Sequence, residues 1–144
     1  MGQSRRITMK DNWSGRLAPN LDDLEDMAQL AFARLPDTFR ALCAEVVIRV
    51  TDFPTDEVLE ELGAETPFDL LGLFQGVGLA QDGATAQTGQ MPNMVFLYRR
   101  PILDYWAENE ETLGDIITHV LVHEIGHHFG LSDQDMEEVE ARAD

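Results

Sequence analysis

The stretch that decides the fold is residues 112–133, which read TLGDIITHVLVHEIGHHFGLSD. Thr112 can cap a helix, apolar residues follow it at helical spacing, and Gly130 can end the helix. The pattern predicts a helix that continues through Phe129 and is apolar around most of its circumference. Because helices of that kind are usually buried in a core, we expect this helix to be the central element of the domain.

Two histidines in this helix are spaced as metal ligands. His123 and His127 are four residues apart, so they project from one helical face and can place two imidazole nitrogens on one metal ion. Glu124 is rotated about 100° from His123 around the helix, so its carboxylate can reach the water that the metal activates rather than the metal itself. This His-Glu-x-x-His arrangement predicts a zinc site with Glu124 as the general base of a hydrolytic reaction.

A zinc ion with an open position for water needs a third protein ligand. Gly130 has no Cβ and can take a left-handed conformation, which would fold the chain back and bring Asp133 to the metal. Asp133 is therefore the predicted third ligand. Asp133 could instead cap a last helix or provide charge in its first turn, a possibility that Ser132 shares. Asp135, Glu137 or a water molecule could then take its place at the metal.

The two other histidines lie close to the motif. His128 is four residues after Glu124, so it can hydrogen-bond Glu124, line a cleft or simply be solvated. His119 is four residues before His123 and forms a second pair on the same stripe, so it could compete for the metal. No glutamate follows His119. We therefore expect it to support the site from outside or to lie at the surface.

The spacing His-Glu-x-x-His-x-x-Gly-x-x-Asp resembles that of the metzincin zinc peptidases, in which the last position is usually His and sometimes Asp. The closer resemblance is to a family of small bacterial proteins described as minimal zincins, metallopeptidase-like proteins with a minimal metzincin-like fold. It extends to Leu70–Gly76 and Phe96–Ile102. The resemblance implies zinc, with one ion expected per chain, but no known substrate. From the proposed hydrolytic chemistry we expect the substrate to be a peptide or protein. The roles that the resemblance implies are zinc ligands at His123, His127 and Asp133 and a general base at Glu124.

The rest of the chain predicts short helices around a small sheet. Helices are expected at residues 21–34, 55–62, 102–106 and 132–141, with a helical turn within 36–43. Strands are expected at residues 45–50, 70–75 and 93–99. Together with the long helix they predict an α+β fold, a mixed sheet of three or four strands packed on the motif helix. Residues 21–144 are expected to form one domain after a polar arm at 1–20 that could dock through Trp13.

A substrate cleft would need further residues around the motif. In zincins an extended substrate adds to a sheet edge, which residues 93–99 or residues 70–75 could offer. The glycine-rich segment 76–90 is a candidate lid or cleft wall. Tyr98 and Tyr105 could donate hydrogen bonds to an oxyanion, although an ordinary half-buried tyrosine is the favoured interpretation of each.

Composition excludes several classes of protein. The chain has 144 residues with 10 Lys and Arg against 27 Asp and Glu, a formal net charge of -17, so phosphate backbones and anionic lipid would be repelled. We therefore expect no nucleic-acid partner and no membrane association. The arginine pair at 5–6 is not followed by the apolar segment of an export signal, and the single cysteine, Cys43, cannot form an internal disulfide. A cytoplasmic protein is expected, with its oligomeric state left open.

A second interpretation of the same site stays open. A minimal fold has few walls to shape a substrate cleft, so the zinc could be structural or weakly bound. The protein would then be a zinc-binding interaction or regulatory module rather than an enzyme.

Overall fold

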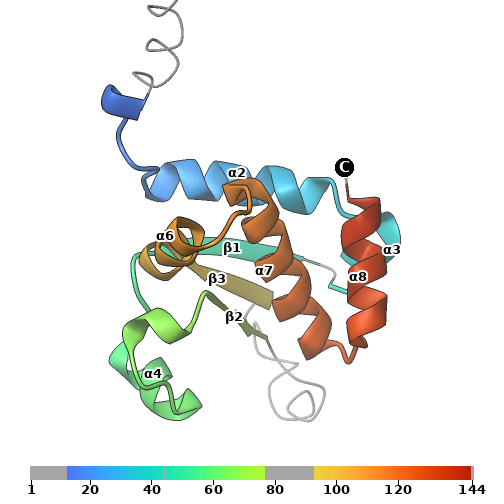
Figure 1. Ribbon diagram of the computed structural model, residues 1–144. Coiled ribbons are helices and arrows are strands. Elements are labelled where there is room, and N and C mark those ends of the chain that lie inside the picture. The colour runs from blue at the N-terminus through green and yellow to red at the C-terminus, as the bar shows by residue number, and fades with distance from the viewer. Residues whose placement is uncertain (1–12, 44, 77–92, 144) are drawn as a thin grey trace, which may run out of the picture.

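The described residues form a three-stranded mixed sheet (Figure 1). In this computed structural model, which describes residues 13–43, 45–76 and 93–143, the strands are β1 (Val46–Thr51), β2 (Gly72–Gln75) and β3 (Asn93–Tyr98). The strand order is β1-β3-β2, with β1 parallel to β3 and β2 antiparallel to it. The predicted α+β fold with a small mixed sheet is confirmed.

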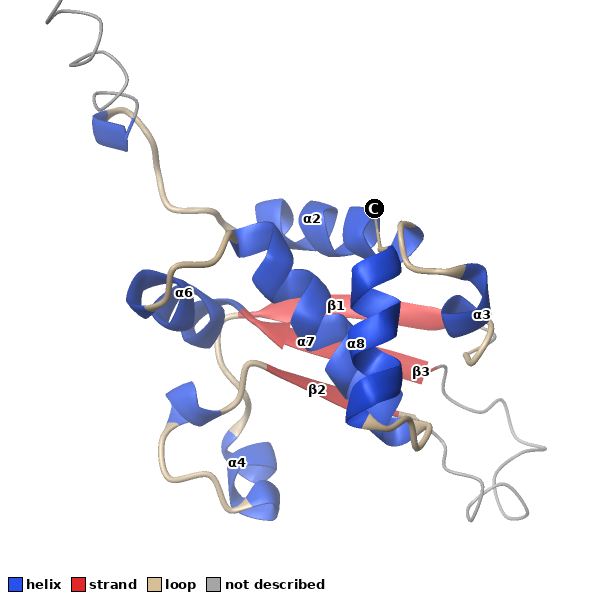
Figure 2. Ribbon diagram, turned by 45° about the vertical axis from the view of Figure 1, so that its right-hand side comes forward, coloured by secondary structure: helices blue, strands red, loops and turns tan. Residues whose placement is uncertain are grey.

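Helices surround this sheet. They are α2 (Leu21–Ala33), α3 (Asp37–Arg40), α4 (Asp56–Leu62), α6 (Arg99–Glu108), α7 (Leu113–His128) and α8 (Asp133–Arg142), with the short 3-10 helix η1 at Pro67–Asp69. In Figure 1, α7 crosses in front of the strands while α2 runs along the top of the sheet, and Figure 2 shows the same two helices from a second direction. The motif helix therefore lies directly on the sheet.

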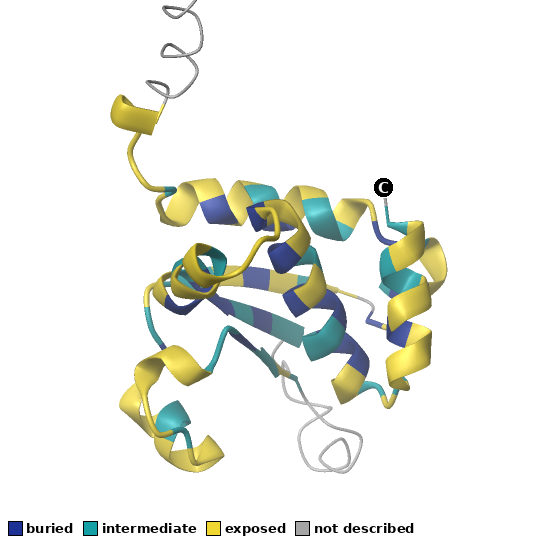
Figure 3. Cartoon of the chain, viewed as in Figure 1, coloured by how far each residue is buried: buried dark blue, intermediate teal, exposed yellow. Residues whose placement is uncertain are grey.

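The core is built around α7. Eight of its sixteen residues are buried. All of them except Gly126 join one apolar cluster with Leu24 and Ala28 of α2, Ile48 of β1 and Val95 of β3. Figure 3 shows buried positions both along α7 and along the strands of the sheet. The expectation of a central, buried motif helix is confirmed.

Local sequence signals set most helix boundaries. Asn20 and Asp23 form a capping box at α2, and Thr112 accepts a hydrogen bond from the backbone of Asp115 at α7. Gly63 and Gly130 end α4 and α7 with φ of 68° and 81°, the left-handed region that glycine favours.

One predicted boundary is wrong. The helix expected at residues 102–106 begins three residues earlier, as α6, and runs from Arg99 to Glu108. Pro101 therefore lies inside the first helical turn instead of before the helix. A proline is tolerated there because the backbone N–H that it lacks has no partner within the helix.

The strand order corrects a second expectation. Residues 93–99 cannot offer a free sheet edge, because β3 is the central strand and pairs on both sides. The other candidate, residues 70–75, contains β2, which is an outer strand. Strand β2 is therefore the edge beside the motif helix.

Part of the N-terminal arm contacts the domain. The rings of Trp13 and Trp106 have centroids 6.3 Å apart, and Nε of Arg99 donates a 2.6 Å hydrogen bond to the carbonyl of Pro19. The rest of the arm, residues 1–12, lies outside the described residues, as does the candidate lid at 76–90 except for Gly76. Among the described helices, none is long and apolar enough to cross a membrane.

Candidate metal centre

Helix α7 presents three histidines on one stripe, since His119, His123 and His127 follow one another at intervals of four residues. The rings of His123 and His127 have centroids 5.4 Å apart, and those of His119 and His123 are 3.9 Å apart. His123 is half-buried, whereas His119 and His127 are exposed. The predicted pair therefore lies at the solvent-accessible side of a helix whose other side is in the core.

A cleft of about 430 Å³ lies along this stripe. Helix α7 forms one wall, and the chain at the start of β2, with Tyr105 of α6, forms another. The residues that line it are Asp69, Leu70, Leu71, Gly72, Tyr105, Glu111, Ile116, His119, Val120, His123, Glu124 and His127. The cleft thus brings together both predicted histidine ligands and the predicted general base.

Glu124 occupies a half-buried position suited to a base. Burial is the largest influence on its carboxyl group and raises its pKa, while the charge of His127 and a hydrogen bond from the backbone N–H of Phe74 oppose that rise. Burial and the charge of Glu124 also raise the pKa of Tyr98, to about 12. Glu124 therefore lies close enough to Phe74 of β2 and to Tyr98 at the end of β3 to interact with both.

Asp133 is the first residue of α8, and its side chain is exposed. Its charge is close enough to His123 to raise the pKa of that imidazole, although burial and His119 have larger effects and lower it overall. Among the described residues, Asp133 is not gathered with His123 and His127 into a set of ligand atoms close enough to share an ion. Ser132 is the N-cap of α8 and forms a capping box with Asp135. The alternative role in helix capping is therefore observed for Ser132.

The described residues do contain one cluster with metal-ligand proximity: His119, His123 and Glu140, with ligand atoms all within 4.8 Å of one another. Glu140 was not a candidate from the sequence. The signal that could have found it is its spacing of four from Met136, because a residue on the buried face of α8 places the residue four positions later on the same face. That face of α8 is the one that meets α7.

The three remaining candidate residues, His128, Tyr98 and Tyr105, differ in their exposure to solvent and in their access to the cleft. His128 is exposed and packs against Phe74, with ring centroids 4.2 Å apart, so its ring faces β2. Tyr105 lines the cleft and is 38% exposed, whereas Tyr98 is buried. Of the two tyrosines, Tyr105 is thus the one with access to a bound substrate.

The donor set fits zinc. Imidazole and carboxylate are ordinary zinc ligands, and catalytic zinc sites keep one position open to solvent. Here two imidazoles project from one helical stripe into an open cleft, and carboxylates of α8 lie beside that stripe. The structure therefore offers ligands of the right kind and access for an ion.

A helix that carries His-Glu-x-x-His and packs on a small mixed sheet beside a cleft defines the zincin class of fold. The chain belongs to the zincin-like metallopeptidase family, whose model matches residues 43–143. This match confirms the resemblance to the minimal zincins, and it covers the whole sheet, α7 and α8 but not α2. None of the curated proteins compared with the chain matches it.

Proposed function

We propose that this protein is a zinc-dependent peptidase that hydrolyses a peptide or protein substrate. The observation that carries the proposal is the joint presence of His123, Glu124 and His127 in one open cleft. The proposed zinc ligands are His123, His127 and Asp133. When bound, one zinc ion supplies a Lewis acid that lowers the pKa of water and polarises a carbonyl group.

Glu124 is the proposed general base. A carboxylate is a better proton acceptor near neutral pH when its pKa is raised, and burial raises the pKa of Glu124. The backbone of Phe74 and the charge of His127 oppose this rise but do not cancel it. After accepting a proton from water, Glu124 can deliver it to the amine that leaves when the peptide bond breaks.

The outer strand β2 offers a surface for the substrate backbone. The backbone N–H of Tyr98 donates to the carbonyl of Leu71, and hydrogen-bonded pairs alternate along an antiparallel ladder. Gly72 and Phe74 therefore point their backbone groups away from β3. Gly72 also lines the cleft, which supports binding of an extended peptide by strand addition.

The test is hydrolysis of a synthetic peptide library by untagged protein, followed by mass spectrometry. We expect cleavage that stops when a chelator removes metal and returns when zinc is added. His123→Ala should bind no stoichiometric zinc and cleave nothing, because it removes a ligand on which the site depends.

Zinc binding without cleavage by the wild type would contradict the proposal. In that case the same site would belong to a metal-stabilised interaction module. Chelation would then lower the melting temperature of a protein that cleaves no peptide with or without zinc. Circular dichroism of each variant shows whether a loss of cleavage comes from unfolding.

A further inference from the structure

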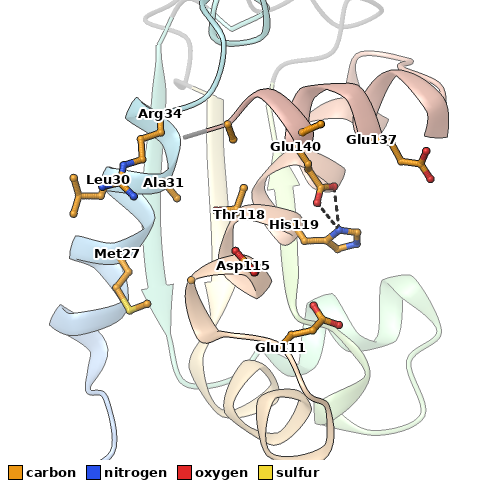
Figure 4. Close-up of a pocket in the computed structure, with 13 residues that line it drawn as sticks. Met27, Leu30, Ala31, Arg34, Glu111, Asp115, Thr118, His119, Glu137 and Glu140 are labelled. Carbon is orange, nitrogen blue, oxygen red and sulfur yellow. Dashed lines mark hydrogen bonds and ion pairs between the residues drawn. The ribbon is translucent and has the colours of Figure 1, made fainter.

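A cluster formed by His119, His123 and Glu140, here called the His119 cluster, lies beside the proposed catalytic site and shares only His123 with it. His119 and His123 come from α7 and Glu140 from the last turns of α8. Figure 4 shows the carboxylate of Glu140 directed at the ring of His119 across the gap between the two helices.

Two distances in the His119 cluster are close to those between the ligands of one ion, and all its ligand atoms lie within 4.8 Å of one another. Nδ1 of His119 lies 3.0 Å from Oε2 of Glu140, and Nε2 of His123 lies 3.4 Å from the same oxygen. Ligand atoms at the corners of a zinc tetrahedron with bonds of 2.0–2.1 Å are about 3.3 Å apart. Two imidazoles and one carboxylate are also a zinc donor set.

A simple ion pair accounts for only part of this arrangement. It explains why the His119 ring meets Glu140, but a surface pair of this kind contributes little to stability. Nε2 of His123 lies 3.4 Å from the same carboxylate oxygen, which is longer than the roughly 2.7–3.2 Å of an ordinary N–H···O hydrogen bond. In a metal site, all three groups converge because they bind one ion.

An ion can reach the His119 cluster from solvent. His119 lines the catalytic cleft and also a second cleft of about 680 Å³ between α2, α7 and α8, which is the one drawn in Figure 4. Glu140 lines the second cleft and is 26% exposed at its side chain. The cluster is thus accessible while its carboxylate stays partly shielded from water.

We propose that His119, His123 and Glu140 form a second binding position for a divalent transition-metal ion of the zinc type. Because this position and the catalytic one share His123, they are alternatives for one ion in one chain. Metal content alone then does not report how many chains are competent for hydrolysis. The inference goes beyond the proposed peptidase function and does not depend on it.

The test uses His127→Ala, which removes the catalytic position and leaves the His119 cluster intact. We expect this variant to bind one zinc ion, measured by competition with a chromophoric chelator, and to cleave no peptide. Adding Glu140→Gln should weaken the zinc affinity at least about tenfold, and adding His119→Ala should do the same. Glu138→Gln in the same background is the matched control, since Glu138 is an exposed carboxylate on α8 that lines neither cleft, and it should leave the affinity within about twofold.

Two results would overturn the inference. One is the absence of zinc binding by a folded His127→Ala protein, and the other is an affinity that Glu140→Gln and Glu138→Gln change equally. Cobalt substitution adds a second readout, because its absorption spectrum should change when Glu140 is replaced. Cleavage by the wild type is measured separately, so failure of the peptidase proposal and failure of this inference give different results.

Discussion

Gly72 and Val120 meet so closely that a Cβ at Gly72 would lie 2.6 Å from Cγ1 of Val120. The same Cβ would lie 2.9 Å from the carbonyl oxygen of Phe96 on the neighbouring strand. The absence of a side chain at Gly72 is therefore what lets α7 pack directly on the outer strand. Gly72 and Val120 both line the cleft that also contains His123, Glu124 and His127.

Replacing Gly72 should be costly for this reason. We expect Gly72→Ala to lower the free energy of unfolding by about 1–3 kcal/mol, as overpacking in a core does, because the backbone oxygen of Phe96 cannot move aside. Gly114→Ala, on α7, is the control, because a Cβ at Gly114 would meet nothing within 4 Å. This substitution should leave the free energy of unfolding unchanged or raise it. Urea denaturation measures both, and equal stability of the two variants would contradict the packing argument.

The turn between α7 and α8 depends on the backbone of Gly130. Its φ of 81° is one that residues with a Cβ rarely adopt, so Gly130→Ala should cost about 1–2 kcal/mol. Gly130→Asn should cost less, because asparagine tolerates the left-handed region better than alanine. Thermal melts of the two variants at one protein concentration measure the difference, and an alanine variant as stable as the wild type would be inconsistent with this turn.

The phenol of Tyr98 should lose its proton at a higher pH than an ordinary tyrosine does. Burial and the charge of Glu124 raise its pKa to about 12, so the folded state holds the phenol proton more tightly than the unfolded state does. This group's contribution to stability is fully present below its unfolded pKa of about 10 and is lost as the pH rises from 10 to about 12. The ultraviolet titration of Tyr105→Phe follows Tyr98 alone, because the chain has 2 tyrosines. A midpoint near 10 while circular dichroism still shows the fold would refute the assigned environment.

Local patterns in the sequence were sufficient for the motif helix. Thr112, Gly130 and the apolar spacing between them predicted α7, and Ser132 predicted the start of α8. These signals work because a helix is stabilised by residues near one another in the chain. The positions of Glu124 and the two motif histidines on α7 followed from the same regularity.

Relationships between distant segments were not predictable in this way. The central place of β3 depends on pairing with β1 and β2, which local periodicity does not encode. The approach of Glu140 to His123 depends on how α8 returns after Gly130 and on the burial of Met136 against Gly126. The first of these determines which strands lie at the edges of the described sheet, and the second brings the His119 cluster together.

The most direct test of the central claim compares Glu124→Gln with the wild type. We expect the variant to keep about one zinc ion per chain, because Glu124 is not a ligand, and to lose peptide hydrolysis by at least about a hundredfold, since general base catalysis contributes about 10²–10⁴-fold. Elemental mass spectrometry and peptide turnover are measured on the same sample. Unchanged turnover with zinc retained would contradict the role of Glu124 and with it the proposed mechanism.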